Sequence, residues 1–117
     1  MNIESFRAYC LKKREAKEGF PFDNNTLVFK VMGKMFALAD VEAFEGVNLK
    51  VNPEYGAELR DRYPFIQHAY HMNKKHWITV VMDGTAPDKL IKGLIDDSYE
   101  LVVLGLTKSH RLALEGK

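Results

Sequence analysis

The segment Thr26–Val41, TLVFKVMGKMFALADV, decides the fold that we expect for this chain. Two runs rich in apolar residues flank the dipeptide Gly33-Lys34, and glycine tolerates the backbone angles that a tight hairpin turn requires. Runs of this kind, bounded by a turn signal, are typical of β-strands. The sequence therefore predicts a hairpin, with strands over TLVFKVM and MFALADV, at the start of an antiparallel sheet.

Three further strands are predicted downstream of this hairpin. In GVNLKVN, residues 46–52, apolar residues alternate with Asn and Lys, which is the period of a strand with one buried and one wet face. FIQHAY and HWITVVMD, residues 65–70 and 76–83, predict two more strands, and HMNKKH between them is expected to be a hairpin turn. The expected sheet thus has five strands.

Two helices are predicted from local start and stop signals in the first half of the chain. Asn2 is expected to cap a helix that ends near Lys13, and the charged run KREAKEG then forms an exposed loop. Asn52 followed by Pro53 predicts the start of a second helix, and Pro64 is expected to stop it.

Two more helices are predicted after the last strand. Thr85 and Asp88 have the spacing of a capping box for a helix that ends near residue 96. Ser98 is expected to cap a further helix through Leu106, although LVVLGL also fits a buried strand by periodicity alone. The polar tail from Lys108 onward is expected to fray.

These elements predict one α+β domain over residues 1–117, in the order α-β-β-β-α-β-β-α-α. A length of 117 residues is ordinary for a single domain, and the 46% hydrophobic and 28% charged residues are typical of a soluble globular protein. Apolar residues on one face of a sheet must be covered, so the helices are expected to pack on one face of the antiparallel sheet.

The charge balance excludes the strongly basic composition that by itself announces nucleic-acid binding. Seventeen Lys and Arg against sixteen Asp and Glu leave a net charge of +1, so any DNA contact must come from a local patch. The single cysteine, Cys10, cannot form an internal disulfide, and MNIESFRAYC lacks the pattern of a signal peptide. No apolar run approaches the ~20 residues of a membrane span. We expect a cytoplasmic monomer with no membrane partner.

The candidate site is the segment HMNKKHW, residues 71–77. Asn73, Lys74 and Lys75 place an amide and two ammonium groups at the expected hairpin tip, where they can reach phosphate oxygens. A solvated turn explains the same residues equally well. Lys30 and Lys50 project from strands and extend the positive charge, although lysines on a wet sheet face need no function.

The aromatic and imidazole groups of this segment allow both functional and structural interpretations. Trp77 can stack on a base, but a lone tryptophan that enters a strand more often anchors the edge of the core. His71 and His76 have no cysteine nearby and lack the spacing of metal ligands. The sequence contains no assembled nucleophile and base and no glycine-rich phosphate loop, so we expect no catalytic residue, no metal and no cofactor.

The stretch AYHMNKKHWITVVMDG, followed by PDKLIKGLIDDSYELVV, resembles the MmcQ/YjbR family of small bacterial proteins. The resemblance covers nearly the whole chain. It implies a CyaY-like fold, in which a curved antiparallel sheet forms a double wing similar to that of a phage transcription activator, and hence a DNA-binding role. The family motif falls on these residues: His71, Met72, Asn73, Lys74, His76 and Trp77, with Ser98 and Tyr99 further along the chain.

Two functional hypotheses remain open from the sequence. The first is a non-enzymatic domain that binds double-stranded DNA with a sheet face and the basic hairpin tip. Its contact residues are Lys50, His71, Asn73, Lys74, Lys75, His76 and Trp77. The alternative is a protein or small-ligand interaction module with a polar-aromatic pocket. Its lining residues are His71, Asn73, His76, Trp77 and Tyr99.

Overall fold

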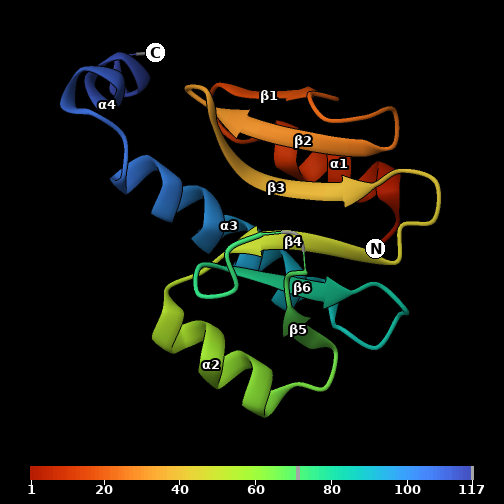
Figure 1. Ribbon diagram of the computed structural model, residues 1–117. Helices are drawn as coiled ribbons and strands as arrows, with labels where there is room; N and C mark the ends of the chain where they lie inside the picture. The colour runs from red at the N-terminus through yellow and green to blue at the C-terminus, as the bar shows by residue number, and fades with distance from the viewer. Residues whose placement is uncertain (71, 117) are drawn as a thin grey trace.

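The computed structural model describes residues 1–70 and 72–116 and confirms an α+β fold (Figure 1). Within these residues, six strands form one antiparallel sheet in the spatial order β1-β2-β3-β4-β6-β5. The elements along the chain are α1 (Ile3–Leu11), β1 (Ala16–Gly19), β2 (Thr26–Val31), β3 (Lys34–Asp40), β4 (Gly46–Lys50), α2 (Pro53–Arg62), β5 (Ile66–His68), β6 (Trp77–Val81), α3 (Asp88–Leu104) and α4 (Lys108–Glu115).

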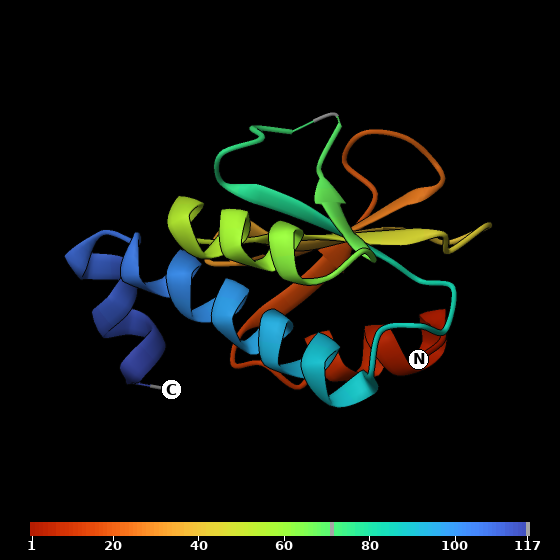
Figure 2. The same ribbon diagram turned by 90° about the horizontal axis from the view of Figure 1, so that it is seen from below.

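The helices and the long loops lie on opposite sides of the sheet. Figure 2 shows α1 and α3 beneath the sheet, and the β1–β2 and β5–β6 loops rising from its other face. The long helix α3 packs on β2, β3 and β4, whereas α2 lies beside β5 and β6. We call the side that α1 and α3 cover the helical face and the other side the open face.

The main hydrophobic core fills the space between the sheet and the helices. Phe6 of α1 meets Phe29 of β2 edge to face with ring centroids 5.7 Å apart. Phe36 of β3 meets Tyr99 of α3 in the same way at 5.3 Å. Edge-to-face pairs add about 0.5–1.5 kcal/mol to the stabilisation from burial. These contacts fix α1 and α3 against the same face.

Local sequence signals place the central hairpin and α2 as expected. In the hairpin, Met32 and Gly33 both have positive φ, at 49° and 82°, so the turn lies one residue earlier than the predicted Gly33-Lys34. Two positive φ values match the right-handed twist of the flanking strands. Before α2, the Asn52 side chain accepts a hydrogen bond from the Glu54 amide at 2.9 Å, and Pro53 occupies the first turn.

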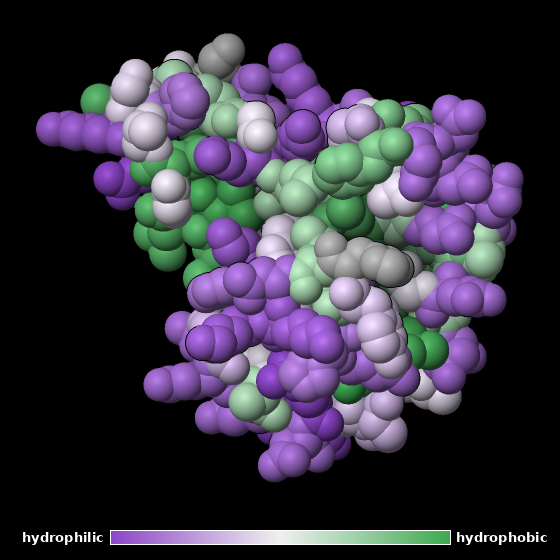
Figure 3. All heavy atoms as spheres, viewed as in Figure 1, coloured by the Kyte–Doolittle hydropathy of each residue, from purple (hydrophilic) through white to green (hydrophobic). Residues whose placement is uncertain are grey.

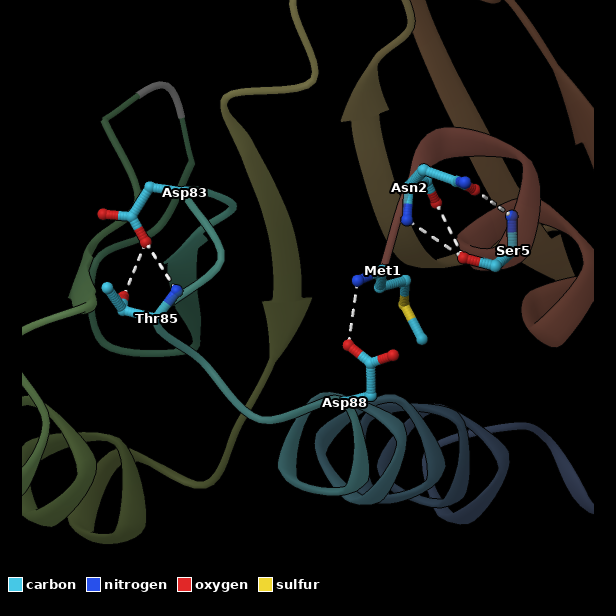
Figure 4. Close-up of polar contacts among 6 residues, drawn as sticks. All are labelled: Met1, Asn2, Ser5, Asp83, Thr85 and Asp88. Atoms are coloured by element: carbon cyan, nitrogen blue, oxygen red, sulfur yellow. Dashed lines mark hydrogen bonds and ion pairs between the residues drawn. The ribbon is translucent and has the colours of Figure 1, made fainter.

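The first helix also begins where its cap predicts. Figure 4 shows the Asn2 side chain accepting from the Ser5 amide and the Ser5 hydroxyl accepting from the Asn2 amide. This reciprocal pair satisfies two amides that the first turn of a helix leaves without partners. The amino-terminal ammonium contacts the Asp88 carboxylate at 2.8 Å, which ties the start of α1 to the start of α3.

The strand β1 departs from the sequence expectation, which gave the KREAKEG run as an exposed loop. Ala16–Gly19 instead pairs antiparallel with β2 as an edge strand. Its charged side chains remain at the surface. The Glu18 carboxylate forms a bidentate ion pair with the guanidinium of Arg7 on α1. An edge strand needs only one backbone partner and tolerates charges, so it lacks the apolar alternation that reveals a strand in sequence.

The two helices predicted near the carboxyl end are one continuous helix, α3. The expected capping box at its start is wrong: Thr85 bonds to Asp83 within the preceding loop (Figure 4), and Pro87 occupies the cap position without a side-chain bond. The polar tail also differs from expectation. Thr107 caps α4 by accepting from the His110 amide, and Leu114 on that helix is buried.

Ser98 lies inside α3 and is fully buried, so it is not the helix cap that the sequence predicted. Its hydroxyl accepts from the Lys50 amide at 2.8 Å and donates to the Phe36 carbonyl at 2.5 Å. The last pair of the β3–β4 ladder is Ala37 with Leu49, so Ser98 inserts where Phe36 and Lys50 would pair next. The hydroxyl satisfies two buried backbone groups and fixes the end of β4.

No helix in the described part of the chain is long and apolar enough to cross a membrane.

Candidate nucleic-acid interface

The β5–β6 hairpin carries the predicted basic tip between its two strands, where the structure describes residues 69–70 and 72–76. The strands pair antiparallel, with His68 opposite Ile78. Asn73 organises the end of the loop: its side chain accepts from the Lys75 amide at 2.9 Å, and its carbonyl accepts from the Trp77 amide at 3.0 Å. Hydrogen bonds of this kind, from an Asn side chain to a nearby backbone amide, stabilise a turn without hydrogen bonds to a neighbouring strand.

The predicted tip residues are exposed. Asn73, Lys74, Lys75 and His76 all lie at the surface of this loop, and His71 lies outside the described residues. The His76 carbonyl accepts from the Val51 amide at 2.8 Å, which anchors the loop end to β4. The loop therefore presents two ammonium groups on a backbone held at its base.

Lys50 lies on the open face, directly opposite Trp77 in the β4–β6 register. The two side chains line a recess of about 290 Å³ with Lys34 and Met35 of β3 and with Val102 and Gly105 at the end of α3. Because the Lys50 amide is bonded to Ser98, the lysine is held at a defined point on this face. Lys34 pairs with Val31 of the main core, so it lies on the helical side at this end of the sheet.

A second pair of lysines extends the positive charge toward the edge of the sheet. Lys17 of β1 lies opposite Lys30 of β2, and both line a recess of about 320 Å³ beneath the β1–β2 loop. Lys17 was not predicted because its strand was expected to be a loop. In residues 1–70 and 72–116, none of five lysines on the open face and its loops forms an ion pair: Lys17, Lys30, Lys50, Lys74 and Lys75.

Trp77 is only 8% exposed and belongs to a small second cluster on the open face. Its buried neighbours are Val28, Leu38 and Ala69, with Met35 and Met72 packed around them. The structure thus favours the anchoring interpretation of Trp77, because burial leaves little of the indole surface for a base to stack on.

Three other aromatic side chains on the open-face loops are exposed and were not predicted. Phe20 and Phe22, on the β1–β2 loop, are 49% and 63% exposed, and Tyr70, on the β5–β6 loop, is 79% exposed. From the viewpoint of Figure 1, Figure 3 shows hydrophilic side chains over α2 and the β5–β6 loop, with paler hydrophobic surface between the loops. A loop phenylalanine carries no periodic signal, so sequence patterns do not reveal its exposure.

The polar-aromatic pocket of the alternative hypothesis is not assembled as predicted. Tyr99 lies on the helical face, where its hydroxyl donates to the Arg14 carbonyl at 2.7 Å, whereas Trp77 belongs to the open-face cluster. Burial, the largest cause, raises the pKa of Tyr99, and the nearby Glu100 carboxylate adds to it. The sheet separates the two aromatic groups.

The described residues contain no group of three or more His, Cys, Asp and Glu side chains able to hold a metal ion. Cys10 is buried in the core, and this burial raises the pKa of its thiol to about 12. A neutral, buried thiol is a poor nucleophile and a poor metal ligand.

The fold and the basic open face together define a small α+β domain with one covered and one uncovered sheet face. A sequence model of the YjbR family matches residues 11–101, and the chain belongs to this family. The uncharacterized protein YjbR of Escherichia coli K12 is 35% identical over 97% of this chain and 98% of its own. The uncharacterized protein YbdF of Escherichia coli O157:H7 is 41% identical over 76% of this chain and 74% of its own.

Solved structures share this fold. The crystal structure of Deinococcus radiodurans protein DR2400, with domain DUF419, is similar at a TM-score of 0.89 and 44% identity, over 97% of this chain and 88% of that one. A crystal structure of a Pseudomonas syringae protein is similar at a TM-score of 0.73 and 35% identity, over 86% of this chain and 98% of that one. The family resemblance noted from the sequence is therefore confirmed.

Proposed function

We propose that this chain is a non-enzymatic DNA-binding domain that contacts the phosphate backbone with its open face and its β5–β6 loop. The observation that carries the proposal is the gathering of five lysines, none of them ion-paired within the described residues, on that face and its loops. Lysine ammonium groups that are free of carboxylates release counterions from DNA on contact, which supplies most of the non-specific binding energy.

A near-neutral net charge is compatible with this proposal, because contact with DNA depends on the local charge of the face. Three acidic side chains lie among the helices: Asp97 and Glu100 line the groove between α2 and α3, and Asp96 pairs with Lys13 of α1. Glu18 lines the same recess as Lys17 and Lys30 and lowers the positive charge there.

We also propose that the chain acts as a monomer in the cytoplasm. One chain supplies the whole basic face, and its single cysteine is buried. The exposed Phe20, Phe22 and Tyr70 flank the same face and offer positions for stacking on unpaired bases. A single strand of the same sequence is for this reason the informative comparison ligand beside the duplex.

The test is a titration of labelled duplex DNA with the protein at several salt concentrations, in which the anisotropy of the label reports binding. With several phosphate contacts and no base-specific signature, we expect a Kd of about 10⁻⁴ to 10⁻⁶ M that weakens as salt rises. Changing Lys17, Lys30 and Lys50 together to Gln should lower the salt slope by about one unit for each lysine that binds a phosphate.

The matched control changes three exposed lysines of the helical side, Lys12, Lys89 and Lys108, to Gln. This variant has the same net charge as the first, so it reports the effect of overall charge alone. Absence of binding to either duplex or single strand at low salt would reject the proposal, as would equal salt slopes for the two triple variants.

A further inference from the structure

A polar recess lies between α2 and the β5–β6 hairpin, beside the sheet edge. It has a volume of about 690 Å³, enough for a small ligand. Its lining is unlike that of the core, because basic and amide groups predominate. The lining residues are Ala57, Arg60, Asp61, Ile66, Gln67, His68, Tyr70 and Lys74.

Arg60 lines this recess, and one end of its side chain is buried against α2 and the sheet. Its Nη1 atom is buried, yet it has no hydrogen-bond partner among the described residues. Arginine remains ionised in proteins, and a buried charged donor without an acceptor is costly. The buried end of the guanidinium holds Arg60 at a fixed place beside the recess.

The neighbourhood of Gly56 is shaped around this guanidinium. A Cβ atom at position 56 would lie 3.3 Å from Arg60 Nη1 and 2.8 Å from Val51 Cγ2. Glycine one turn earlier in α2 thus leaves room for the guanidinium to fold back along the helix toward the sheet. The position of Nη1 follows from close packing, and the side chain is not a freely moving surface arginine.

Arg60 and Lys74 approach the recess from different elements, α2 and the β5–β6 loop. The Tyr70 hydroxyl and the Gln67 amide add neutral donors, and His68 adds an imidazole. The Asp61 carboxylate repels an anion. With Arg60 and Lys74 positive and Asp61 negative, the recess carries a net charge of +1 when His68 is neutral. Arginine with lysine and neutral donors suits a phosphate group, because the guanidinium fork matches its oxygens.

We propose that this recess is a binding site for a phosphate group. The proposal goes beyond the DNA-binding function, because Arg60 and the recess lie at the α2 edge and share only Lys74 with the five lysines of the open face and its loops. The phosphate can come from a small phosphorylated ligand or from a strand of nucleic acid, and the two sources make the same contacts.

The experiment is an NMR titration of the full chain with inorganic pyrophosphate at constant ionic strength, balanced with chloride. We expect the backbone amides of Gln67, His68 and Lys74 to shift in a saturable way. Arg60→Gln keeps a polar side chain but removes the charge and should weaken pyrophosphate binding about tenfold, as expected for one charge-assisted hydrogen bond.

Arg62→Gln is the matched control, because it removes the same charge from an exposed position two residues along the same helix. It should change pyrophosphate affinity by less than about twofold. Thermal unfolding of both variants checks that α2 is intact. We expect Arg60→Gln to unfold no earlier than the unchanged protein, since it removes an unpaired buried charge.

Two results would overturn the proposal. One is an absence of saturable shifts at the recess up to about 10 mM pyrophosphate, a range that covers even weak sites. The other is an equal loss of affinity in Arg60→Gln and Arg62→Gln, which would mean general electrostatic attraction.

A second experiment, DNA binding by Arg60→Gln with and without pyrophosphate, identifies the source of the phosphate. If Arg60→Gln weakens DNA binding to the same degree and pyrophosphate competes with DNA, the recess takes a nucleic-acid phosphate. If DNA binding is unchanged in Arg60→Gln, the recess takes a small phosphorylated ligand. Failure of the DNA proposal leaves the pyrophosphate titration unaffected, so the two proposals fail separately.

Discussion

The two faces of the sheet use the same backbone for different purposes. On the helical face, Phe6, Phe29, Phe36 and Tyr99 form a continuous aromatic core with α1 and α3. On the open face, four buried residues form a small cluster, surrounded by lysines and by loops with exposed aromatic groups. The first face has the composition of a protein interior, and the second has that of a mostly polar surface with a small apolar cluster.

Because of this difference, we expect the stability of the protein and its proposed function to depend on different residues. A strand projects alternate side chains to opposite faces, so neighbouring positions on β3 and β4 serve different faces. Leu49 and Val51 belong to the main core, and Lys50 between them faces outward. We expect changes on the helical face to affect unfolding and changes of the open-face lysines to affect binding.

The largest effect is expected for Phe36→Ala. Phe36 is fully buried on the helical face, and its truncation should reduce the free energy of unfolding by about 3–5 kcal/mol. Denaturant unfolding measures this loss. Leu38→Ala, on the same strand but in the small cluster, should cost less because solvent can enter the vacated space. An equal or larger cost for Leu38→Ala would contradict the assignment of the main core to the helical face.

The next effect tests the Ser98 link between α3 and the ends of two strands. Ser98→Ala removes the acceptor for the Lys50 amide and the donor to the Phe36 carbonyl. Leaving buried polar groups without partners costs about 1–3 kcal/mol each, so we expect a loss of about 2 kcal/mol or more in denaturant unfolding. Asp97→Ala, at the exposed neighbouring position, should stay within about 0.5 kcal/mol. Equal stability of the two variants would mean that the buried hydroxyl is dispensable.

A pH effect of intermediate size is expected from Cys10 in the main core. Burial raises the pKa of its thiol from about 9 to about 12. Above pH 9 the unfolded chain loses this proton while the folded chain keeps it, so the contribution to stability is complete below about pH 9 and declines toward pH 12. Between about pH 8 and pH 10 the unchanged protein should lose about 1.4 kcal/mol more than Cys10→Ala.

Urea unfolding of both proteins at several pH values gives this difference. The tyrosines whose pKa values are raised, Tyr9 and Tyr99, are present in both proteins and cancel in the comparison. Parallel stability curves for the two proteins would show that the thiol ionises equally in the folded and unfolded states.

The smallest effect on stability is expected at the tip of the β5–β6 loop. Lys74 and Lys75 are exposed and form no ion pair with any described residue, so changing both to Ala should leave the free energy of unfolding within about 0.5 kcal/mol. The salt slope of DNA binding should fall by up to about two units, one for each lysine that binds a phosphate. If unfolding changes strongly, the tip is structural; if neither quantity changes, the tip is a solvated turn.

The sequence by itself determined the elements whose signals are local. The hairpin from Thr26 is indicated by two apolar runs and a glycine, and α2 by Asn52, Pro53 and Pro64. A cap or a ring-fixed φ acts within a few residues, so its effect can be inferred without knowledge of the rest of the chain. The exposed, basic character of Asn73, Lys74 and Lys75 was predictable for the same reason.

Only the tertiary structure decided the features that depend on distant partners. β1 exists because β2 offers its backbone, and Ser98 inserts between two strands that lie far from it in sequence. Lys17 joins the open face through sheet pairing, and Arg60 reaches the recess beside Lys74 through helix packing. Hydrogen bonds and packing between distant segments leave no periodic pattern in either segment alone, because each residue type there is compatible with several environments until its partner is in place.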